Sequence, residues 1–323
     1  MRETEYAYGV ARIRANELTL LSAAEIDRLV AASGYKEALR ILADNGWVAP
    51  EKGTDFTTML EAKSRETWAL LTEVMPDIRE LDSLIITNDF FNLKAALKAT
   101  FSDDEPCLYT VTPSVHPPET VCEAAATKHF ELLPAYMQAP AEEAYDAIVR
   151  LESGRLADIF LDTAALNTRL DLAAQTGNAL LKDIARTVCA SANIKTAVRC
   201  ARLGKDAAFM RRAMCRCASF DADRIAETAL TGINELAAYL AVSFSEDAAE
   251  ALKAGEAAFE KWSDEAVVRS LQSAAFTPFG IEPFAAYFVR KELEIKNVRI
   301  ILAAKLNNIP AEQIRKRVRD VYA

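Results

Sequence analysis

The sequence contains little of what catalytic and nucleotide-binding sites are built from. Its 323 residues include only 2 histidines and 10 glycines. The phosphate-binding patterns Gly-x-Gly-x-x-Gly and Gly-x-x-x-x-Gly-Lys-[Ser/Thr] do not occur, and neither does a Gly-x-Ser-x-Gly nucleophile elbow or a His-Glu-x-x-His zinc motif. We therefore predict that the protein is not itself an enzyme and has no catalytic, cofactor-binding or metal-binding residues. An enzyme with an unfamiliar arrangement of residues is the alternative.

Long apolar runs and an excess of positive charge are missing too. No stretch approaches the roughly 18 apolar residues of a membrane-spanning helix. The polar and acidic start, Met1–Glu5, does not have the pattern of a secretory signal. Because 38 Lys and Arg residues face 47 Asp and Glu residues, the net charge of -9 argues against nonspecific nucleic-acid binding. These features predict a protein that is made and kept in the cytoplasm.

The few potential metal ligands and acid-base groups favour structural roles. The 6 cysteines include no Cys-x-x-Cys pair and are predicted to be reduced. Cys215-x-Cys217 lacks a nearby His or Cys that would complete a tetrahedral metal site. His116, in a Pro-rich segment, and His129, in an expected helix, are predicted to be structural or solvated. Three acidic pairs lie at expected loops and helix starts, where carboxylates stabilise the first turn: Asp103-Asp104, Glu142-Glu143 and Glu246-Asp247.

What is abundant is typical of helices. Ala, Leu, Glu, Arg and Lys are common, whereas Gly and Pro number only 10 and 11, so the composition predicts an all-α fold. Ser22-Ala23-Ala24-Glu25 and Thr120-Val121-Cys122-Glu123 have the form of capping boxes. The last expected helix starts at Pro310 and has Ile314, Val318 and Tyr322 on one side. The main helices before it are expected at residues 5–21, 22–34, 35–45, 55–75, 77–100, 178–203 and 221–242, with a further one ending near 307.

Three short segments recur at one fixed interval of 101 residues: Asn92-Leu93-Lys94, Asn193-Ile194-Lys195 and Glu294-Ile295-Lys296. A repeat of this length, in which each copy ends in a helix, predicts three similar lobes rather than one fold around a central active site. In two copies a second cation follows four residues later, Lys98 and Arg199, so both cations project from one side of the helix. In the third copy Ile300 occupies that place and the second cation is Arg299, so the third helix is expected to present its charge differently.

The predicted lobes comprise residues 1–105, 106–218 and 219–323. The boundary between the first two follows from the segment 102–120, which is rich in proline and polar residues and is predicted to be a linker. Its prolines are Pro106, Pro113, Pro117 and Pro118.

Two stretches near the ends of the chain carry a specific resemblance. The first is Tyr-Ala-Tyr-Gly-Val-Ala-Arg-Ile-Arg-Ala at residues 6–15, followed by Glu17 and Leu20-Leu21. The second is Glu-Leu-Glu-Ile-Lys-Asn-Val-Arg-Ile-Ile at residues 292–301, followed by Lys305. Together they resemble the C subunit of the prokaryotic V/A-type ATPase (ATP synthase), the equivalent of the d subunit of the eukaryotic vacuolar enzyme. The segments 89–94 and 193–195 resemble internal motifs of the same family, so the resemblance extends over the whole chain.

This resemblance implies an all-helical funnel of three similar domains with pseudo-threefold symmetry. It implies a peripheral protein on the cytoplasmic face of the membrane, seated on the proteolipid ring, whose mouth receives the central axle formed by the D and F subunits. The protein would be a socket in the central rotor that links ATP hydrolysis or synthesis to H⁺ or Na⁺ transport. It would bind no nucleotide, small-molecule substrate or nucleic acid itself.

A socket of this kind needs polar residues that order its wall or contact its partners. Bracing between helices inside the protein is the alternative role for the same residues. The candidates are Arg12, Arg14, Asn92, Lys94, Lys98, Asn193, Lys195, Arg199, Glu294, Lys296 and Arg299.

The competing function is that of a free-standing helical adaptor or scaffold, which alanine-rich amphipathic helices also permit. Helical solenoids usually repeat every 20 to 50 residues, so the interval of 101 residues argues against this class.

Overall fold

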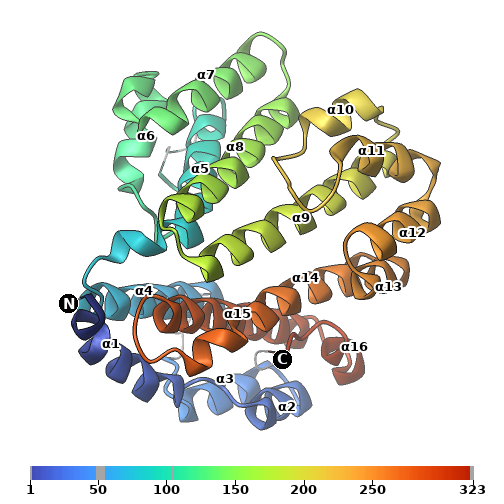
Figure 1. The fold of residues 1–323 in the computed structure, drawn as a ribbon. Helices are drawn as coiled ribbons and strands as arrows, with labels where there is room; N and C mark the ends of the chain where they lie inside the picture. Colours follow the sequence, from blue (N-terminus) through green and yellow to red (C-terminus); the bar gives the residue numbers. More distant parts are fainter. Residues whose placement is uncertain (1, 49–54, 103–104, 106, 321–323) are drawn as a thin grey trace. The chain divides into compact units, whose positions relative to one another are not determined.

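Every regular element in the described part of the chain is a helix (Figure 1). The computed structural model describes residues 2–48, 55–102, 105 and 107–320, and it confirms the predicted all-α fold. Asp103-Asp104, Pro106 and Tyr322 lie outside the described residues. None of the described helices combines the length and the apolar character needed to cross a membrane.

The chain divides into two compact units. The first is formed by both ends of the chain, residues 1–78 and 254–323, and the second by residues 79–253. The division into three lobes and the pseudo-threefold funnel stay predictions.

The first unit contains seven α-helices among the described residues. They are α1 (Arg2–Glu17), α2 (Ala23–Ala31), α3 (Tyr35–Asp44), α4 (Phe56–Val74), α14 (Glu256–Ser270), α15 (Glu282–Leu306) and α16 (Ala311–Arg315), with the 3₁₀ helix η3 (Leu271–Phe276) before α15. Helices α1, α3, α4, α14 and α16 all contact α15. Val298, Ile301 and Leu302 of α15 are buried in one cluster with Leu29 and Leu42 of α2 and α3. Because α15 is enclosed by its neighbours, most of its residues are buried, and these include the polar Lys291, Glu294 and Asn297.

The second unit is built from the middle helices of the chain. They are α5 (Asp82–Ala99), α6 (Pro118–Thr127), α7 (Ala135–Val149), α8 (Gly154–Gln175), α9 (Ala179–Arg202), α10 (Ala207–Arg212), α11 (Ala222–Thr231), α12 (Ile233–Ser243) and α13 (Glu246–Ala254). Two 3₁₀ helices, η1 (Ile78–Leu81) and η2 (Phe130–Leu132), precede α5 and α7.

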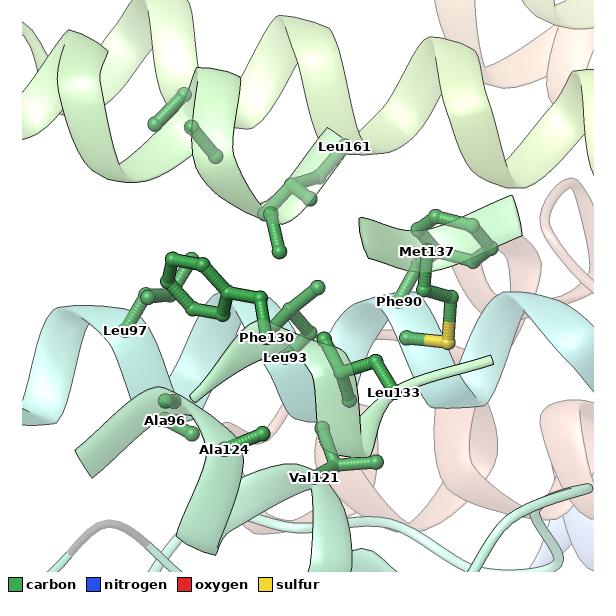
Figure 2. Packing of buried hydrophobic residues seen from close by; sticks show 14 of the residues in the cluster. Phe90, Leu93, Ala96, Leu97, Val121, Ala124, Phe130, Leu133, Met137 and Leu161 are labelled. Carbon is green, nitrogen blue, oxygen red and sulfur yellow. The ribbon is translucent and has the colours of Figure 1, made fainter. Parts of the chain in front are cut away.

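A hydrophobic cluster holds α5 against α6, α7 and α8 (Figure 2). Leu93 and Leu97 of α5 lie with Val121 of α6, Phe130 of η2 and Leu161 of α8 in this cluster. Each fully buried leucine or phenylalanine contributes about 1.5–3 kcal/mol. The cluster therefore fixes the position of α5, which carries the first of the repeated segments.

Local capping chemistry decides some helix starts and is overridden at others. The capping box at Ser22 is confirmed, because the Glu25 N–H donates to Ser22 Oγ (3.3 Å) and the Ser22 N–H donates to Glu25 Oε2 (2.7 Å). These hydrogen bonds lower the pKa of Glu25. The predicted box at Thr120 is wrong: α6 begins at Pro118, whose fixed φ suits the first position of a helix.

Two predicted helices are shorter than expected. The helix predicted at 221–242 is broken into α11 and α12 at Gly232, whose φ of 149° is incompatible with a continuous helix. The last helix ends at Arg315, so Val318 lies beyond it. One reason is that the Arg319 N–H donates to the side chain of Asn297 and not to a helical carbonyl.

The segment between α5 and α6 packs against α5. Asn88 Nδ2 donates to the Pro113 carbonyl (2.7 Å). Cys107 and Cys122 form a disulfide with their Cα atoms 5.8 Å apart. The prediction of reduced cysteines is therefore wrong for these two, because the folded-back segment brings residues 15 positions apart into contact. The other four cysteines are free thiols.

Candidate functional site

Three buried asparagines on the long helices α5, α9 and α15 make the same pair of hydrogen bonds. Each side-chain Nδ2 donates to the carbonyl of a residue about 20 positions later, and the N–H of that same residue donates to the asparagine Oδ1. We call this arrangement an asparagine clasp. The distances are 3.0 and 2.7 Å for Asn92 with Val111, 2.9 and 2.9 Å for Asn193 with Cys215, and 3.0 and 2.9 Å for Asn297 with Arg319.

The side-chain amide suits this role because it offers one acceptor and one donor, as a peptide group does. It forms hydrogen bonds with the N–H and C=O of a loop residue, two groups that are not hydrogen-bonded within a helix. The three asparagines are 0%, 1% and 0% exposed, so water cannot replace the lost hydrogen bonds. The clasps therefore fix the path of the segment that returns to each long helix.

The clasps correct the alignment of the third repeated segment. Glu294-Ile295-Lys296 falls at the fixed interval, but the residue that makes the clasp is Asn297. The equivalent segments are therefore Asn92-Leu93-Lys94, Asn193-Ile194-Lys195 and Asn297-Val298-Arg299. In all three the central aliphatic residue is completely buried, with 0% exposure.

Acidic residues one turn before the clasp add backbone contacts in two of the three copies. Asp89 accepts hydrogen bonds from the N–H groups of Val115 (2.9 Å) and His116 (2.8 Å). Burial raises the pKa of the Asp89 carboxyl, and these two donors offset part of that effect. Glu294 accepts from the Leu21 N–H (2.5 Å) and from Lys291 Nζ (2.6 Å). Because Asn92, Asn193 and Glu294 are all buried, their observed contacts brace the interior of the units.

Three of the candidate cations also connect helices. Lys94 forms an ion pair with Asp162, and Lys98 Nζ lies 2.7 Å from Asp158 Oδ1, so both connect α5 to α8. Lys296 Nζ lies 2.6 Å from Asp264 Oδ2 and connects α15 to α14. Of the remaining cations on the repeated helices, Arg199 and Arg299 are exposed and Lys195 is half-buried.

The two arginines of α1 differ in their surroundings. Arg12 is at the surface, with Nη1 2.9 Å from the Tyr8 hydroxyl and 3.5 Å from Glu73 Oε1. Arg14 pairs with Glu17 at 2.9 Å and donates from Nη2 to the Ala274 carbonyl at 2.8 Å. Arg14 therefore holds η3 against α1, while Arg12 contacts residues of α1 and α4.

A hollow with a volume of about 320 Å³ is lined by α5 and by the segment that follows it. Phe91 and Tyr109 remain 45% and 57% exposed there. Its two lysines, Lys94 and Lys98, are paired with aspartates of α8. The lining residues are Phe91, Lys94, Ala95, Lys98, Ala99, Ser102 and Tyr109.

Gly9 is a structurally important residue of the N-terminal stretch that pattern analysis did not single out. A Cβ atom at this position would lie 2.3 Å from the Val74 carbonyl oxygen and 2.8 Å from the Phe284 ring. Only glycine lets α1 approach α4 and α15 this closely. The signal available in the sequence was a glycine inside an otherwise helical pattern.

Comparison with known proteins adds a match over nearly the whole chain. The family model described as ATP synthase (C/AC39) subunit matches residues 9–317. The C subunit of the A-type ATP synthase of Methanocaldococcus jannaschii is 24% identical over 352 residues, which cover 96% of this chain and 85% of the relative. The C subunit of the V-type sodium ATPase of Enterococcus hirae is 23% identical over 322 residues, which cover 96% of this chain and 97% of the relative.

Proposed function

The chain belongs to the ATP synthase (C/AC39) subunit family, and on that basis we propose that it is the socket of a V/A-type rotary ATPase. In this proposal it is a non-catalytic part of the central rotor. It joins the axle of the D and F subunits to the membrane proteolipid ring, so that rotation couples ATP hydrolysis or synthesis to H⁺ or Na⁺ transport. The observation that carries the proposal is the family match over residues 9–317.

The internal construction of the units supports a part that transmits torque. Close-packed helices are hardly compressible, and α15 is enclosed by five other helices of its unit. Asparagine clasps and ion pairs add directional contacts between helices and loops, which resist sliding of one element past another. A part built in this way passes rotation on with little internal deformation.

The proposed location is the cytoplasmic face of the membrane, where the protein is peripheral and sits on the ring. We assign contacts with these partners to the candidate residues whose side chains are exposed at the surface, Arg199 and Arg299. Polar contacts at an interface permit specific association and also release.

We further assign the hollow on α5 to the axle. Aromatic residues are enriched at protein interfaces because they bury a large area with few rotatable bonds. Phe91 and Tyr109, with Phe101 and Leu108 nearby in sequence and also about half exposed, supply such a surface. Because the lysines of the hollow are paired with aspartates of α8, its apolar lining fits a helix of the axle that presents apolar side chains.

The experiment that tests the function is purification of the tagged protein from its native cell after mild solubilisation of the membranes. Mass spectrometry of the co-purifying proteins should identify the proteolipid together with the D and F subunits. A clean monomer, or a set of unrelated partners, would contradict the socket and favour the free-standing adaptor.

The axle contact is tested with the same purification. Phe91→Ala should reduce the recovery of the D and F subunits relative to the wild type. Leu132→Ala is the matched control, because Leu132 lies in the same unit and is 44% exposed against 45% for Phe91. Equal recovery with both variants would place the axle elsewhere on the protein.

A further inference from the structure

Two free thiols of the second unit lie side by side in its interior. Cys189 of α9 and Cys215, in the segment after α10, are 0% and 4% exposed, and their side chains are hydrogen-bonded to each other. Cys215 Sγ also lies 3.8 Å from the Cys189 carbonyl oxygen. We call these two residues the thiol pair. The proposed function uses neither thiol, so the pair is available for a separate role.

The Asn193 clasp brings the two sulfur atoms together. Cys189 and Asn193 are four residues apart on α9, so they face the same side of the helix. The clasp holds the backbone of Cys215 against Asn193, and Cys215 Sγ lies 3.3 Å from Asn193 Oδ1. The side chain of Cys215 is therefore directed at α9, where Cys189 lies one turn before the clasp.

A cation lies next to the thiol pair. Arg169 of α8 donates from Nη2 to the Leu84 carbonyl (3.1 Å) and to Thr87 Oγ1 (3.0 Å). Its Nε is buried and has no hydrogen-bond partner in the described part of the chain. The guanidinium interacts electrostatically with Cys189, and among the described residues no ion pair joins it to a carboxylate. Arg169 is therefore placed to stabilise a negative charge on the thiol pair.

The surroundings favour ionisation of Cys189 over Cys215. The hydrogen bond from Cys215 lowers the pKa of the Cys189 thiol, and the charges of Arg169 and Arg216 lower it further, against the opposing effect of burial. The same hydrogen bond, together with burial, raises the pKa of Cys215. In its neutral form Cys189 donates to the Leu166 carbonyl at 3.6 Å. Because the thiolate is the nucleophile in thiol oxidation, Cys189 is the sulfur that reacts first.

We propose that the thiol pair is a reversible redox site, which hydrogen peroxide converts into a Cys189–Cys215 disulfide. The Cys189 thiolate attacks one oxygen of H₂O₂, the O–O bond breaks, and Cys189 becomes a sulfenic acid as hydroxide leaves. The Cys215 thiol then attacks the Cys189 sulfur, so that the S–S bond forms and the S–O bond breaks. The departing hydroxyl takes the Cys215 proton and leaves as water, while the first hydroxide combines with the proton that Cys189 lost.

The reaction balances without a further reactant. Two thiols lose two electrons, and one H₂O₂ is reduced to two molecules of water. Hydrogen peroxide suits a buried pair because it is hardly larger than water, whereas a bulky disulfide oxidant reaches the pair only when the unit opens. The inference does not depend on the proposed function.

The disulfide makes covalent the contact that the clasp makes by hydrogen bonds. Cys189 and Cys215 are 26 positions apart, so the bond closes a loop that contains the end of α9 and all of α10. Closing a loop lowers the conformational entropy of the unfolded chain. Oxidation should therefore raise the urea concentration at the unfolding midpoint of the second unit, and leave the tryptophan transition of the first unit unchanged.

The test is treatment of the folded full-length protein with hydrogen peroxide, followed by alkylation of the remaining thiols in denaturant and tryptic mass mapping. Trypsin separates the pair into the peptides 187–195, with Cys189, and 213–216, with Cys215. We expect to recover these two peptides as one disulfide-linked species that dithiothreitol separates. If the oxidised native protein contains no such species, the proposal is overturned.

The other two free thiols are internal controls. Burial raises the pKa of Cys200, and Cys217 is more exposed and lies two residues from Cys215. Cys217→Ser should leave the yield of the linked peptides at the wild-type level. If Cys215 pairs with Cys217 instead, or if Cys200 and Cys217 are oxidised as fast as the thiol pair, the surroundings of the pair confer nothing and the proposal is wrong.

Two further variants separate the attacking sulfur from the resolving one. Cys215→Ser should stop at the Cys189 sulfenic acid, which dimedone traps when it is added with the denaturant. Cys189→Ser should leave Cys215 unoxidised. Circular dichroism checks that both variants are folded, and the wild-type map decides the question if either is not. A sulfenic acid on Cys215 in the folded Cys189→Ser variant, or no adduct on Cys189 in the folded Cys215→Ser variant, would overturn the assignment of roles.

Discussion

Replacing Asn297 by alanine removes one clasp from the first unit and leaves the N–H and C=O of Arg319 without these partners. Asn297 is 0% exposed and Arg319 is 6% exposed, so water cannot easily reach either group. An unsatisfied buried polar group costs about 1–3 kcal/mol. With two such groups, we expect Asn297→Ala to lower the free energy of unfolding by about 2–6 kcal/mol.

The protein offers a fluorescence signal that is specific for this unit. Its 3 tryptophans are Trp47, Trp68 and Trp262, and all of them belong to the first unit. Urea unfolding followed by tryptophan fluorescence therefore reports on the unit that contains the clasp. Asn193→Ala removes a clasp from the second unit. We expect it to lower the urea concentration at the unfolding midpoint of that unit, which is followed by helical circular dichroism after the change that accompanies the tryptophan transition is subtracted.

Asn307→Ala is the matched control. Asn307 lies at the end of the same helix and is exposed, and its Nδ2 donates only to the Ala303 carbonyl at 2.8 Å. Its replacement should change stability by no more than about 0.5 kcal/mol. If Asn297→Ala destabilises the unit no more than Asn307→Ala does, the clasp contributes nothing and the argument for its bracing role is refuted.

Three further predictions use the same unfolding assay. Lys291→Met should destabilise the first unit by about 3–5 kcal/mol, because it leaves the buried Glu294 carboxylate without its countercharge at 2.6 Å; adding Glu294→Gln should restore much of this loss, and a stable single variant would contradict the reasoning. Burial raises the pKa of Glu292, so the folded state binds this proton more tightly than the unfolded state does, and stability falls as the pH rises above the ordinary glutamate value. Glu292→Gln cannot ionise and should therefore exceed the wild type in stability at neutral pH, with the difference vanishing in acid; a difference that does not depend on pH would count against this. Gly9→Ala should cost about 1–3 kcal/mol or more, because its Cβ would lie 2.3 Å from the last carbonyl oxygen of α4, whereas Gly34→Ala, where the Cβ meets no atom within 4 Å, should show no such loss.

Local chemistry was sufficient to predict much of the helical structure. The capping box at Ser22, the short helix closed before Gly46 and the long helix α9 follow from residues that are neighbours in the chain. The predictions failed where a more distant or competing contact decided the outcome. At Thr120 the preceding proline pair starts the helix earlier, and near Arg319 a side chain from α15 replaces the helical hydrogen bond.

The candidate site was predicted by residue type but not by role. Two lysines spaced four apart on a helix can contact a partner at the surface, or they can form ion pairs with a neighbouring helix of the same protein. Lys94 and Lys98 pair with aspartates that lie more than 50 positions away in sequence, and no local pattern identifies such partners. Arg12 and Arg14 are two residues apart, yet one is at the surface and the other holds a distant turn.

The sequence by itself determined the helical class and, through the stretches near its two ends, the family. It also contained three segments of the form asparagine, aliphatic residue, cation, at 92, 193 and 297. Only the tertiary structure decided that Asn297, and not Glu294, is the third equivalent residue. The reason is physical: a clasp joins a helix to a loop residue about 20 positions later, so it depends on the path of that loop through the folded unit. Composition and periodicity determine which helices form, whereas packing determines which polar groups meet.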